Sequence, residues 1–338
     1  TLDAYLDHGK ADLTLSIEVD KAQEHLAKLG SMGIDLDVIT SKLLEDGLAS
    51  FGKSFETLLA GIAEKRDKLR SGYFPISSNL GNYQQVVANA LQEVKKDRII
   101  ERIWAHDYTV WKPGPKEIAN RLGWLDIANR MQDIMPRLTG LADAVRGQGY
   151  NQAVLLGMGG SSLAPEVFRK TFGVREGFLD LIVLDSTDPG AVLTLANQLN
   201  LARTLFIVST KSGNTPETLS FFKYFYNLVA SREGLDNAGE HFIAITDPGS
   251  KLVEIACRYA FRDTFLNDPN IGGRYSVLSY FGLVPAALIG VDLAKLLDRA
   301  VTAVCNCETC ACSLEGENQG VLIGVILGEL AKSGRNKD

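Results

Sequence analysis

The chain has 338 residues, of which 46% are hydrophobic and 22% charged, and its formal net charge is −6. This composition is typical of globular proteins, and the length suggests about two domains. Nucleic acids and anionic membrane surfaces are disfavoured as partners, because both are bound by basic faces. The sequence shows no signal peptide, and its most apolar runs (281–291 and 320–331) are shorter than the ~20 residues of a membrane span. We therefore expect a cytoplasmic protein.

The first part of the chain is predicted to be helical. Over residues 1–70, apolar residues recur at every third or fourth position for several turns. A stretch rich in Gly, Ser, Pro and Asn follows at 71–81 and indicates a linker. Helical patterns then cover 82–106 and a further stretch that ends near residue 146. We interpret residues 71–146 as a linker followed by a helical segment.

The pattern changes to alternating strands and helices in the predicted domain 147–312. Such alternation indicates βαβ units and an α/β fold with a doubly wound, mostly parallel sheet flanked by helices. In these sheets ligands bind beyond the carboxyl ends of the strands. Residues 313–338 are predicted to begin a further helical part. Apolar runs place the strands at the start of 152–162 and at 179–186, 204–210, 241–247 and 263–268.

The first strand runs into a glycine-rich turn, "GMGGSS", at residues 157–162. Glycines permit a tight turn, and the following helix offers N–H groups to an anion. One alternative is a dinucleotide-binding turn, with Gly157 and Gly159 matching the fingerprint and Asp185 on the ribose. Ser162 stands where that fingerprint has its third glycine. The other alternative is a tight turn that binds no ligand.

The stretch "STKSGNTPET" at residues 209–218 follows another predicted strand. Thr215 is the predicted N-cap of the next helix, with Pro216 as its first residue. Hydroxyls, backbone amides and the helix dipole favour a phosphate at this position, and Lys211 adds a positive charge. Helix capping explains Thr215 and Pro216, but not the additional polar residues Ser209, Thr210, Lys211, Ser212 and Thr218.

A third motif, "NIGGRYSVLS", occupies residues 270–279. Gly272 and Gly273 expose the backbone directly before Arg274. An arginine in this position can point into a cleft and stabilise negative charge that develops in a reaction. Taken alone, it is more often a surface or ion-paired residue.

These three motifs, in this order and spacing, resemble the first sugar-isomerase (SIS) domain of phosphoglucose isomerase over residues 80–338. The helical start resembles the C-terminal tail of transaldolase. The two resemblances together imply part of a bacterial transaldolase–phosphoglucose isomerase fusion, with no cofactor, a small sugar phosphate as its ligand and a possible homo-oligomeric state.

The resemblance also implies roles for individual residues. Arg274 would stabilise the enediolate formed between glucose 6-phosphate and fructose 6-phosphate. The catalytic base and the ring-opening groups would lie beyond Asp338, so this part alone would be inactive. A non-catalytic phosphosugar-binding SIS module is the second interpretation, and an NAD oxidoreductase is the third. In the phosphoglucose isomerase interpretation, the resemblance implies that the phosphate of the sugar is bound by Ser161, Thr210, Lys211, Ser212, Thr215 and Thr218. The backbone cradle around it would be formed by Gly159, Gly160, Gly213 and Gly273.

Four of the five cysteines lie in "CNCETCAC", at positions 305, 307, 310 and 312. The spacing permits a soft metal or disulfides. The alternative is a continued helix on which the cysteines are small apolar residues. On a helix, Cys305 and Cys307 face different directions, so one ion could not be bound by all four. We therefore predict free thiols on a helix or its frayed end, without metal.

Overall fold

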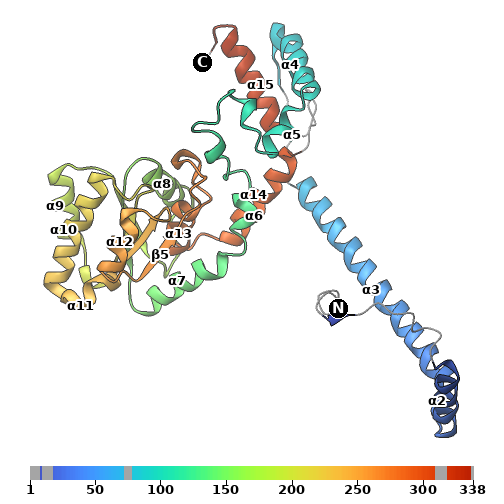
Figure 1. Ribbon diagram of the computed structural model, residues 1–338. Helices are drawn as coiled ribbons and strands as arrows, with labels where there is room; N and C mark the ends of the chain where they lie inside the picture. The colour runs from blue at the N-terminus through green and yellow to red at the C-terminus, as the bar shows by residue number, and fades with distance from the viewer. Residues whose placement is uncertain (1–7, 10–17, 72–77, 309–317, 336–338) are drawn as a thin grey trace. The chain divides into compact units, whose positions relative to one another are not determined.

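The computed structural model describes residues 8–9, 18–71, 78–308 and 318–335. It divides into two compact units, Thr1–Lys68 and Leu69–Asp338. The division falls close to residue 70, where the sequence predicts the end of the helical tail. The described part of the first unit contains α2 (Val19–Ser31) and most of α3 (Leu36–Ser71), which are blue in Figure 1.

The second unit is built around a five-stranded sheet with the order β2-β1-β3-β4-β5. All neighbouring strands are parallel, which confirms the predicted α/β fold. The register aligns Gly157 with Ser209, so the two motif-bearing turns leave the same edge of the sheet. The strands are β1 (Gln152–Gly157), β2 (Asp180–Leu184), β3 (Thr204–Ser209), β4 (Phe242–Thr246) and β5 (Asp263–Leu266).

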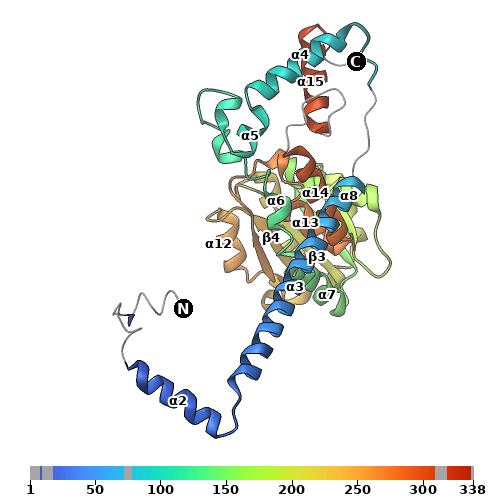
Figure 2. The ribbon, with the colours of Figure 1, turned by 90° about the vertical axis from the view of Figure 1, so that its right-hand side faces the viewer.

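Helices cover both faces of the sheet (Figures 1 and 2). Side chains alternate along each strand; in β1, Ala153 and Leu155 belong to one core, and Val154 and Leu156 to the other. The first core is completed by α7 (Met135–Gly147), α8 (Gly160–Phe172), α13 (Tyr280–Leu288) and α14 (Leu293–Cys307). The second is completed by α9 (Pro189–Gln198), α10 (Pro216–Glu233), α11 (Leu235–Ala238) and α12 (Lys251–Arg258).

The helical segment before the sheet is more broken than the sequence predicts. Residues 82–106 form two helices, α4 (Gln84–Lys96) and α5 (Ile99–Trp104), because Arg98 adopts a left-handed φ of 52° between them. The stretch that ends near residue 146 contains only α6 (Ile127–Arg130) and α7 as α-helices. The described part of the unit also contains short 3-10 helices at Gly81–Tyr83, Tyr108–Val110, Ala119–Arg121, Leu201–Arg203, Gly239–His241 and Gly273–Tyr275.

A small third core joins α4 to the last helix, α15 (Gln319–Lys332). Val87 and Leu91 of α4 pack with Leu322 of α15, and both figures show the two helices side by side. Residues before and after the sheet are thus packed together within the second unit. Among the described helices, none combines the length and the apolar character that crossing a membrane requires.

Candidate functional site

A polar pocket of about 430 Å³ lies at the carboxyl ends of β1, β3 and β4. This is the edge of an open α/β sheet at which ligands bind. The three motifs found in the sequence all contribute to its wall. The lining consists of Asn120, Arg121, Met158, Gly160, Ser161, Ser209, Thr210, Lys211, Ser212, Thr215, Asp247, Pro269 and Gly273.

The first wall is the turn from β1 into α8. Gly159 is the N-cap of α8, and Ser161 in its first turn is 9% exposed and lines the pocket. A Cβ atom on Gly160 would lie 2.6 Å from the carbonyl oxygen of Gly273, so any larger residue would push this turn away. Gly160 and Gly273, two of the four glycines predicted to form a backbone cradle, thus lie where the first and third motifs meet. The N-terminus of α8 borders the pocket.

The second wall is the turn from β3 into α10. Thr215 is the N-cap of α10 and Pro216 its first residue, as the sequence predicts. The Thr215 hydroxyl does not cap the helix; it hydrogen-bonds the Thr210 hydroxyl, with 2.8 Å between the two oxygens. The Ser212 hydroxyl accepts a bond of 3.3 Å from the backbone N–H of Asn214. Three hydroxyl-bearing residues of one turn, Thr210, Ser212 and Thr215, therefore line the same pocket.

Gly213 has a packing role in this turn. It adopts a φ of +70°, and a Cβ atom there would lie 2.7 Å from the backbone nitrogen of Leu252 and 2.8 Å from Cβ of Ser250. The turn is therefore pressed against the start of α12. Gly213 is absent from the pocket lining, unlike its neighbour Ser212.

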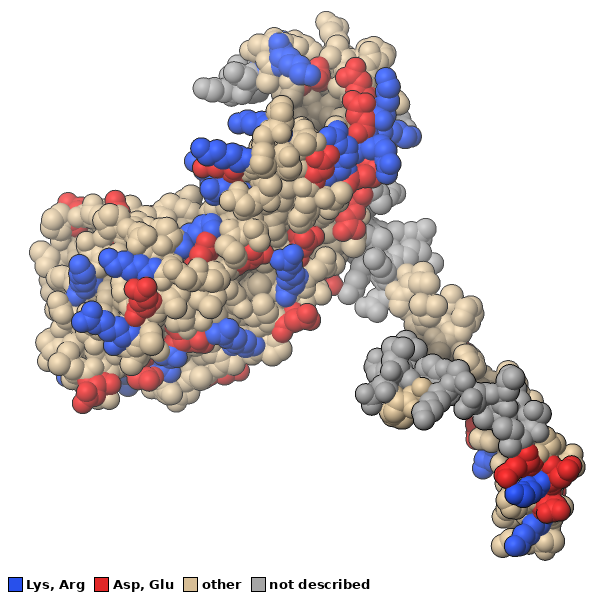
Figure 3. All heavy atoms as spheres, viewed as in Figure 1, with Lys and Arg blue, Asp and Glu red and all other residues tan. Residues whose placement is uncertain are grey.

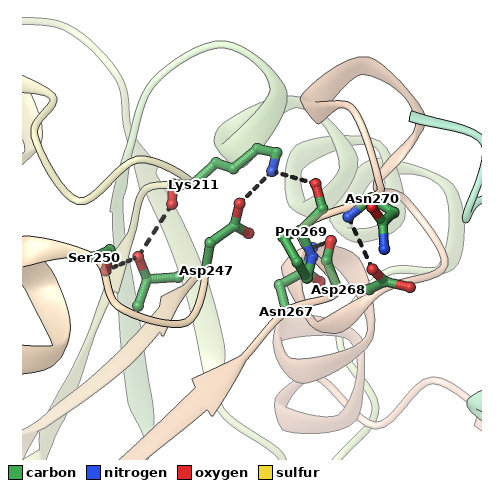
Figure 4. A network of polar contacts seen from close by, with 8 residues as sticks. Lys211, Asp247, Ser250, Asn267, Asp268, Pro269 and Asn270 are labelled. Carbon is green, nitrogen blue, oxygen red and sulfur yellow. Dashed lines mark hydrogen bonds and ion pairs between the residues drawn. The ribbon is translucent and has the colours of Figure 1, made fainter. Parts of the chain in front are cut away.

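Lys211 is already paired in the structure. Its ammonium group makes an ion pair with the carboxylate of Asp247 and donates to the carbonyl oxygen of Pro269 at 3.1 Å (Figure 4). The backbone of the two turns is also joined, because the N–H of Asp247 donates to the carbonyl of Lys211 at 3.1 Å. The positive charge that Lys211 is predicted to add is thus opposed by a carboxylate.

Asp247 is the main residue of the site that the sequence analysis misses. Its side chain is 16% exposed, and its Oδ1 is buried without a hydrogen-bond partner among the described residues. Burial raises the pKa of Asp247 above its ordinary value, while the hydrogen bond from Lys211 lowers the pKa in part. The sequence does contain a signal for Asp247. It is the last residue of the predicted strand 241–247, and the turn that follows lies at the same edge of the sheet as Ser209.

Four residues assigned by resemblance lie outside the lining: Gly159, Gly213, Thr218 and Arg274. Thr218 is fully buried, and its hydroxyl has no hydrogen-bond partner among the described residues. Arg274 is exposed in the short 3-10 helix Gly273–Tyr275, and no hydrogen bond or ion pair joins its side chain to the described residues. The backbone of Gly273 lines the pocket, but the arginine side chain does not. The roles of Thr218 and Arg274 remain predictions.

The loop that carries Pro269 and Gly273 is fixed to the segment before α7. The backbone N–H of Gly123 donates to the carbonyl of Asn270 at 3.0 Å. Asp268 makes an ion pair of 2.7 Å with Arg130 and accepts from the N–H of Asn270 at 2.8 Å. This side of the pocket therefore depends on residues far apart in the sequence.

The cysteine cluster is only partly described. Cys305 and Cys307 lie in the last turns of α14, as the helical interpretation predicts. Burial raises the pKa of the Cys307 thiol. Cys310 and Cys312 lie outside the described residues. Within the described ranges, no group of three or more His, Cys, Asp or Glu residues is arranged to hold a metal ion.

The comparison with protein families supports the resemblance to phosphoglucose isomerase. The family model described as phosphoglucose isomerase matches residues 122–318, more than half of the chain. The chain belongs to the phosphoglucose isomerase family. The match contains all three motifs and most of the residues that line the pocket. The family match does not support the NAD oxidoreductase interpretation. The strand order is a second argument against it, because β2-β1-β3-β4-β5 differs from the 3-2-1-4-5-6 order of dinucleotide-binding Rossmann folds.

Curated relatives are named as glucose-6-phosphate isomerases. The chain is 38% identical over 156 residues to the glucose-6-phosphate isomerase of Prochlorococcus marinus, an alignment that covers 46% of this chain and 29% of that protein. It is 30% identical over 199 residues to the probable glucose-6-phosphate isomerase of Methanococcus maripaludis, covering 57% and 43% of the two chains. The chain thus spans less than half the length of these relatives.

Solved structures share the architecture. A hypothetical protein of Thermus thermophilus superposes with a TM-score of 0.61 and 28% identity, over 71% of this chain and 54% of that one. A glucose-6-phosphate isomerase from Chlamydia trachomatis superposes with a TM-score of 0.60, over 74% of this chain and 51% of that one. Its 20% identity supports the shared fold alone.

Proposed function

We propose that this chain provides a phosphosugar-binding part of a glucose-6-phosphate isomerase, which interconverts glucose 6-phosphate and fructose 6-phosphate through an enediolate. One observation carries the proposal: Ser161, Thr210, Ser212 and Thr215, which all have side-chain hydroxyls, line a single pocket at the carboxyl edge of a parallel sheet. The family membership and the names of the relatives support the choice of substrate.

The pocket has the chemistry that a phosphate monoester requires. Hydroxyl groups can donate to phosphate oxygens, and the N-termini of α8 and α10 add favourable dipoles. The net charge of −6 provides no such attraction. On the face shown in Figure 3, Lys and Arg side chains lie among Asp and Glu side chains. Affinity for an anion must therefore come from local groups.

Isomerisation also needs a base that reaches the protons on C1 and C2. Of the described lining residues, only Asp247 is acidic, and it is ion-paired with Lys211. We propose that the base and the ring-opening groups come from sequence beyond Asp338. Arg274 would stabilise the enediolate once its side chain turns towards the bound sugar.

Calorimetric titration with fructose 6-phosphate tests the binding part of this proposal. We expect saturable binding to one site per chain, and none of comparable strength by fructose or NAD. Tight NAD binding without fructose 6-phosphate binding would contradict the proposal. A coupled assay on a chain extended through the second sugar-isomerase domain separates the enzyme from a non-catalytic binding module, since only the enzyme would turn over.

We also propose, from the resemblance of residues 1–70, that the first unit is the C-terminal tail of a transaldolase-like domain. Helix α3 leaves apolar side chains exposed, including Val38 (64%), Leu48 (65%) and Phe55 (61%), which a preceding domain would cover. A longer natural chain that includes this domain should catalyse transaldol transfer. Its failure to do so, with isomerase activity retained, would remove the fusion part of the proposal alone.

A further inference from the structure

Arg121 lines the pocket although it lies outside all three sequence motifs. It ends the short 3-10 helix Ala119–Arg121 and faces the same pocket as Ser161 and Thr215. Its Nε is buried and has no hydrogen-bond partner among the described residues. Buried polar atoms are nearly always paired, so an orphaned donor needs an explanation. Beside a pocket, the simplest one is a ligand that supplies the acceptor.

The ion pair that Arg121 does make is weak. Its Nη2 lies 3.9 Å from Oε1 of Glu117, whose side chain is 72% exposed. No hydrogen bond forms at this separation, and exposed ion pairs contribute little. The planar donor fork of Arg121 is therefore available to another anion.

The position of Arg121 is set by the loop on which it lies. The neighbouring Gly123 donates its N–H to the carbonyl of Asn270 at 3.0 Å. The arginine side chain lies against Gly272, where an added Cβ atom would be 3.5 Å from Cδ and 3.8 Å from Nη1 of Arg121. The loop that carries Gly272 and Gly273 packs in turn against Gly160, at the start of α8. The guanidinium is thus held near the α8 side of the pocket.

Without the guanidinium of Arg121, the lining would have no net positive charge to attract a phosphate. A phosphate monoester carries about −1.5 to −2 charges at pH 7. The charged side chains of the lining are Arg121, Lys211 and Asp247, two cations and one anion, which gives a net charge of +1. The ion pair of Lys211 with Asp247 cancels within the pocket. Arg121 therefore supplies the net positive charge that a phosphoryl group would meet.

We propose that Arg121 is a phosphoryl-binding residue of this site, which donates its Nε–H and one Nη–H to two oxygens of the bound phosphate. Such a bidentate contact matches guanidinium geometry to phosphate and is stronger than a single neutral hydrogen bond. The inference rests on the proposed function for the identity of the sugar phosphate, and on the pocket itself for the phosphoryl contact.

The test compares Arg121→Gln with the wild-type chain in titrations with fructose 6-phosphate and with inorganic phosphate. Arg121→Gln should weaken both ligands by the same factor, roughly 10- to 100-fold. Arg121→Lys, which keeps the charge but not the fork, should lose less. The matched control is Arg232→Gln, an exposed arginine in the last turn of α10, which removes the same charge far from the pocket. It should change neither affinity by more than twofold.

The possible outcomes test the contact between Arg121 and phosphate separately from the proposed function. If fructose 6-phosphate binds and Arg121→Gln stays within twofold of wild type, the inference is wrong while the function stands. If the variant weakens fructose 6-phosphate but not inorganic phosphate, Arg121 contacts the sugar and the inference is also wrong. Arg121-dependent binding of phosphate without binding of fructose 6-phosphate would refute the function and keep the inference. Failure of both ligands to bind the wild type would refute both.

Glu117→Gln distinguishes ligand binding from a structural role. If Arg121 served only its pair with Glu117, removing that carboxylate would lower the melting temperature as much as Arg121→Gln does. We expect Glu117→Gln to leave the melting temperature unchanged and phosphate affinity unchanged or improved, because the pair is exposed and weak. Equal melting-temperature losses in the two variants, without a phosphate effect, would overturn the proposal.

Discussion

Gly160 and Gly273 meet backbone to backbone, so that a Cβ atom on Gly160 would lie 2.6 Å from the carbonyl oxygen of Gly273. The contact joins the glycine-rich turn after β1 to the loop that precedes α13. The relationship is asymmetric, because a Cβ atom on Gly273 would meet nothing within 4 Å. Both glycines line the pocket, but only Gly273 has room for a larger residue.

Gly160→Ala should therefore disrupt the pocket, whereas Gly273→Ala should be tolerated. The backbone carbonyl cannot move aside as a flexible side chain would, so we expect Gly160→Ala to lower the free energy of unfolding by about 1–3 kcal/mol. Fructose 6-phosphate affinity should fall in the same variant. Urea unfolding and calorimetry measure both effects. Equal behaviour of the two variants would show that the contact does not constrain the site.

Asp247→Asn should strengthen anion binding, because it removes the carboxylate that opposes Lys211. Sulfate is a suitable probe, since it stays a dianion over the pH range of interest. Burial raises the pKa of Asp247 above its ordinary value of 3.8. As the pH falls, Asp247 is therefore protonated at a higher pH than an ordinary aspartate, and Lys211 then loses its counter-charge. Sulfate affinity of the wild type should then increase as the pH falls from 7 towards that pKa.

Asp247→Asn should lose this dependence on pH. The control is Asp236→Asn, an exposed aspartate in α11, which should behave as wild type. If sulfate affinity is the same at every pH in all three proteins, Asp247 does not compete with the bound anion.

Thr218→Val tests the residue that resemblance assigns to the phosphate although it does not line the pocket. Its buried hydroxyl has no partner among the described residues, so an isosteric methyl group should leave the unfolding free energy unchanged or raise it by up to about 1 kcal/mol. If bound phosphate supplies the missing acceptor, affinity for fructose 6-phosphate should fall several-fold. Affinity within twofold of wild type would remove Thr218 from the site.

Thr204→Val is the matched control for this substitution. Thr204 is also fully buried, but its hydroxyl donates to the carbonyl of Asn200 at 2.7 Å. Losing that bond should cost about 1 kcal/mol of unfolding free energy. Ligand affinity should not change, because Thr204 begins β3 at the edge of the sheet opposite the pocket.

Residues 1–338 alone should bind fructose 6-phosphate weakly and isomerise it no faster than background. General acid–base catalysis contributes about 10²–10⁴-fold, so if the base lies beyond Asp338 as proposed, its loss should be plain in a coupled assay. In a chain extended beyond Asp338, Arg274→Ala should lower kcat more than it raises KM, since the enediolate forms only during the reaction. Robust turnover by residues 1–338 that is abolished in Asp247→Asn would identify Asp247 as the base.

The thiols of "CNCETCAC" should bind no stoichiometric metal. Cys305 and Cys307 are two positions apart on α14, so their sulfurs point to different sides of the helix. Elemental analysis of protein purified without chelator measures this directly. About one zinc per chain, with tetrahedral sulfur coordination, would contradict the prediction.

The local features of the site could be predicted from the sequence because each depends on neighbouring residues. The strand ending at Ser209 and the helix starting with Thr215 and Pro216 are set by apolar runs, turn residues and capping preferences. The alternation of such units also implied a parallel sheet, and with it the edge at which the pocket lies.

Contacts between distant segments could not be predicted in this way. The broken helix before residue 135 is an example: Leu122 pairs with Ile271 as an isolated antiparallel bridge, which draws that segment out of helical conformation. A helical pattern records only the preference of the segment itself, and tertiary packing overrides it.

By itself, then, the sequence determined which turns carry hydroxyls and glycines and at which edge of the sheet they lie, since both follow from local periodicity. Only the tertiary structure decided the electrostatics of the pocket. Lys211 is opposed by Asp247, and Arg121 enters the lining from before the sheet. Along the chain, Asp247 lies 36 residues after Lys211, and Arg121 lies 90 residues before it. The physical reason is that a Coulomb interaction depends on distance in space, which the fold sets and the spacing of residues does not.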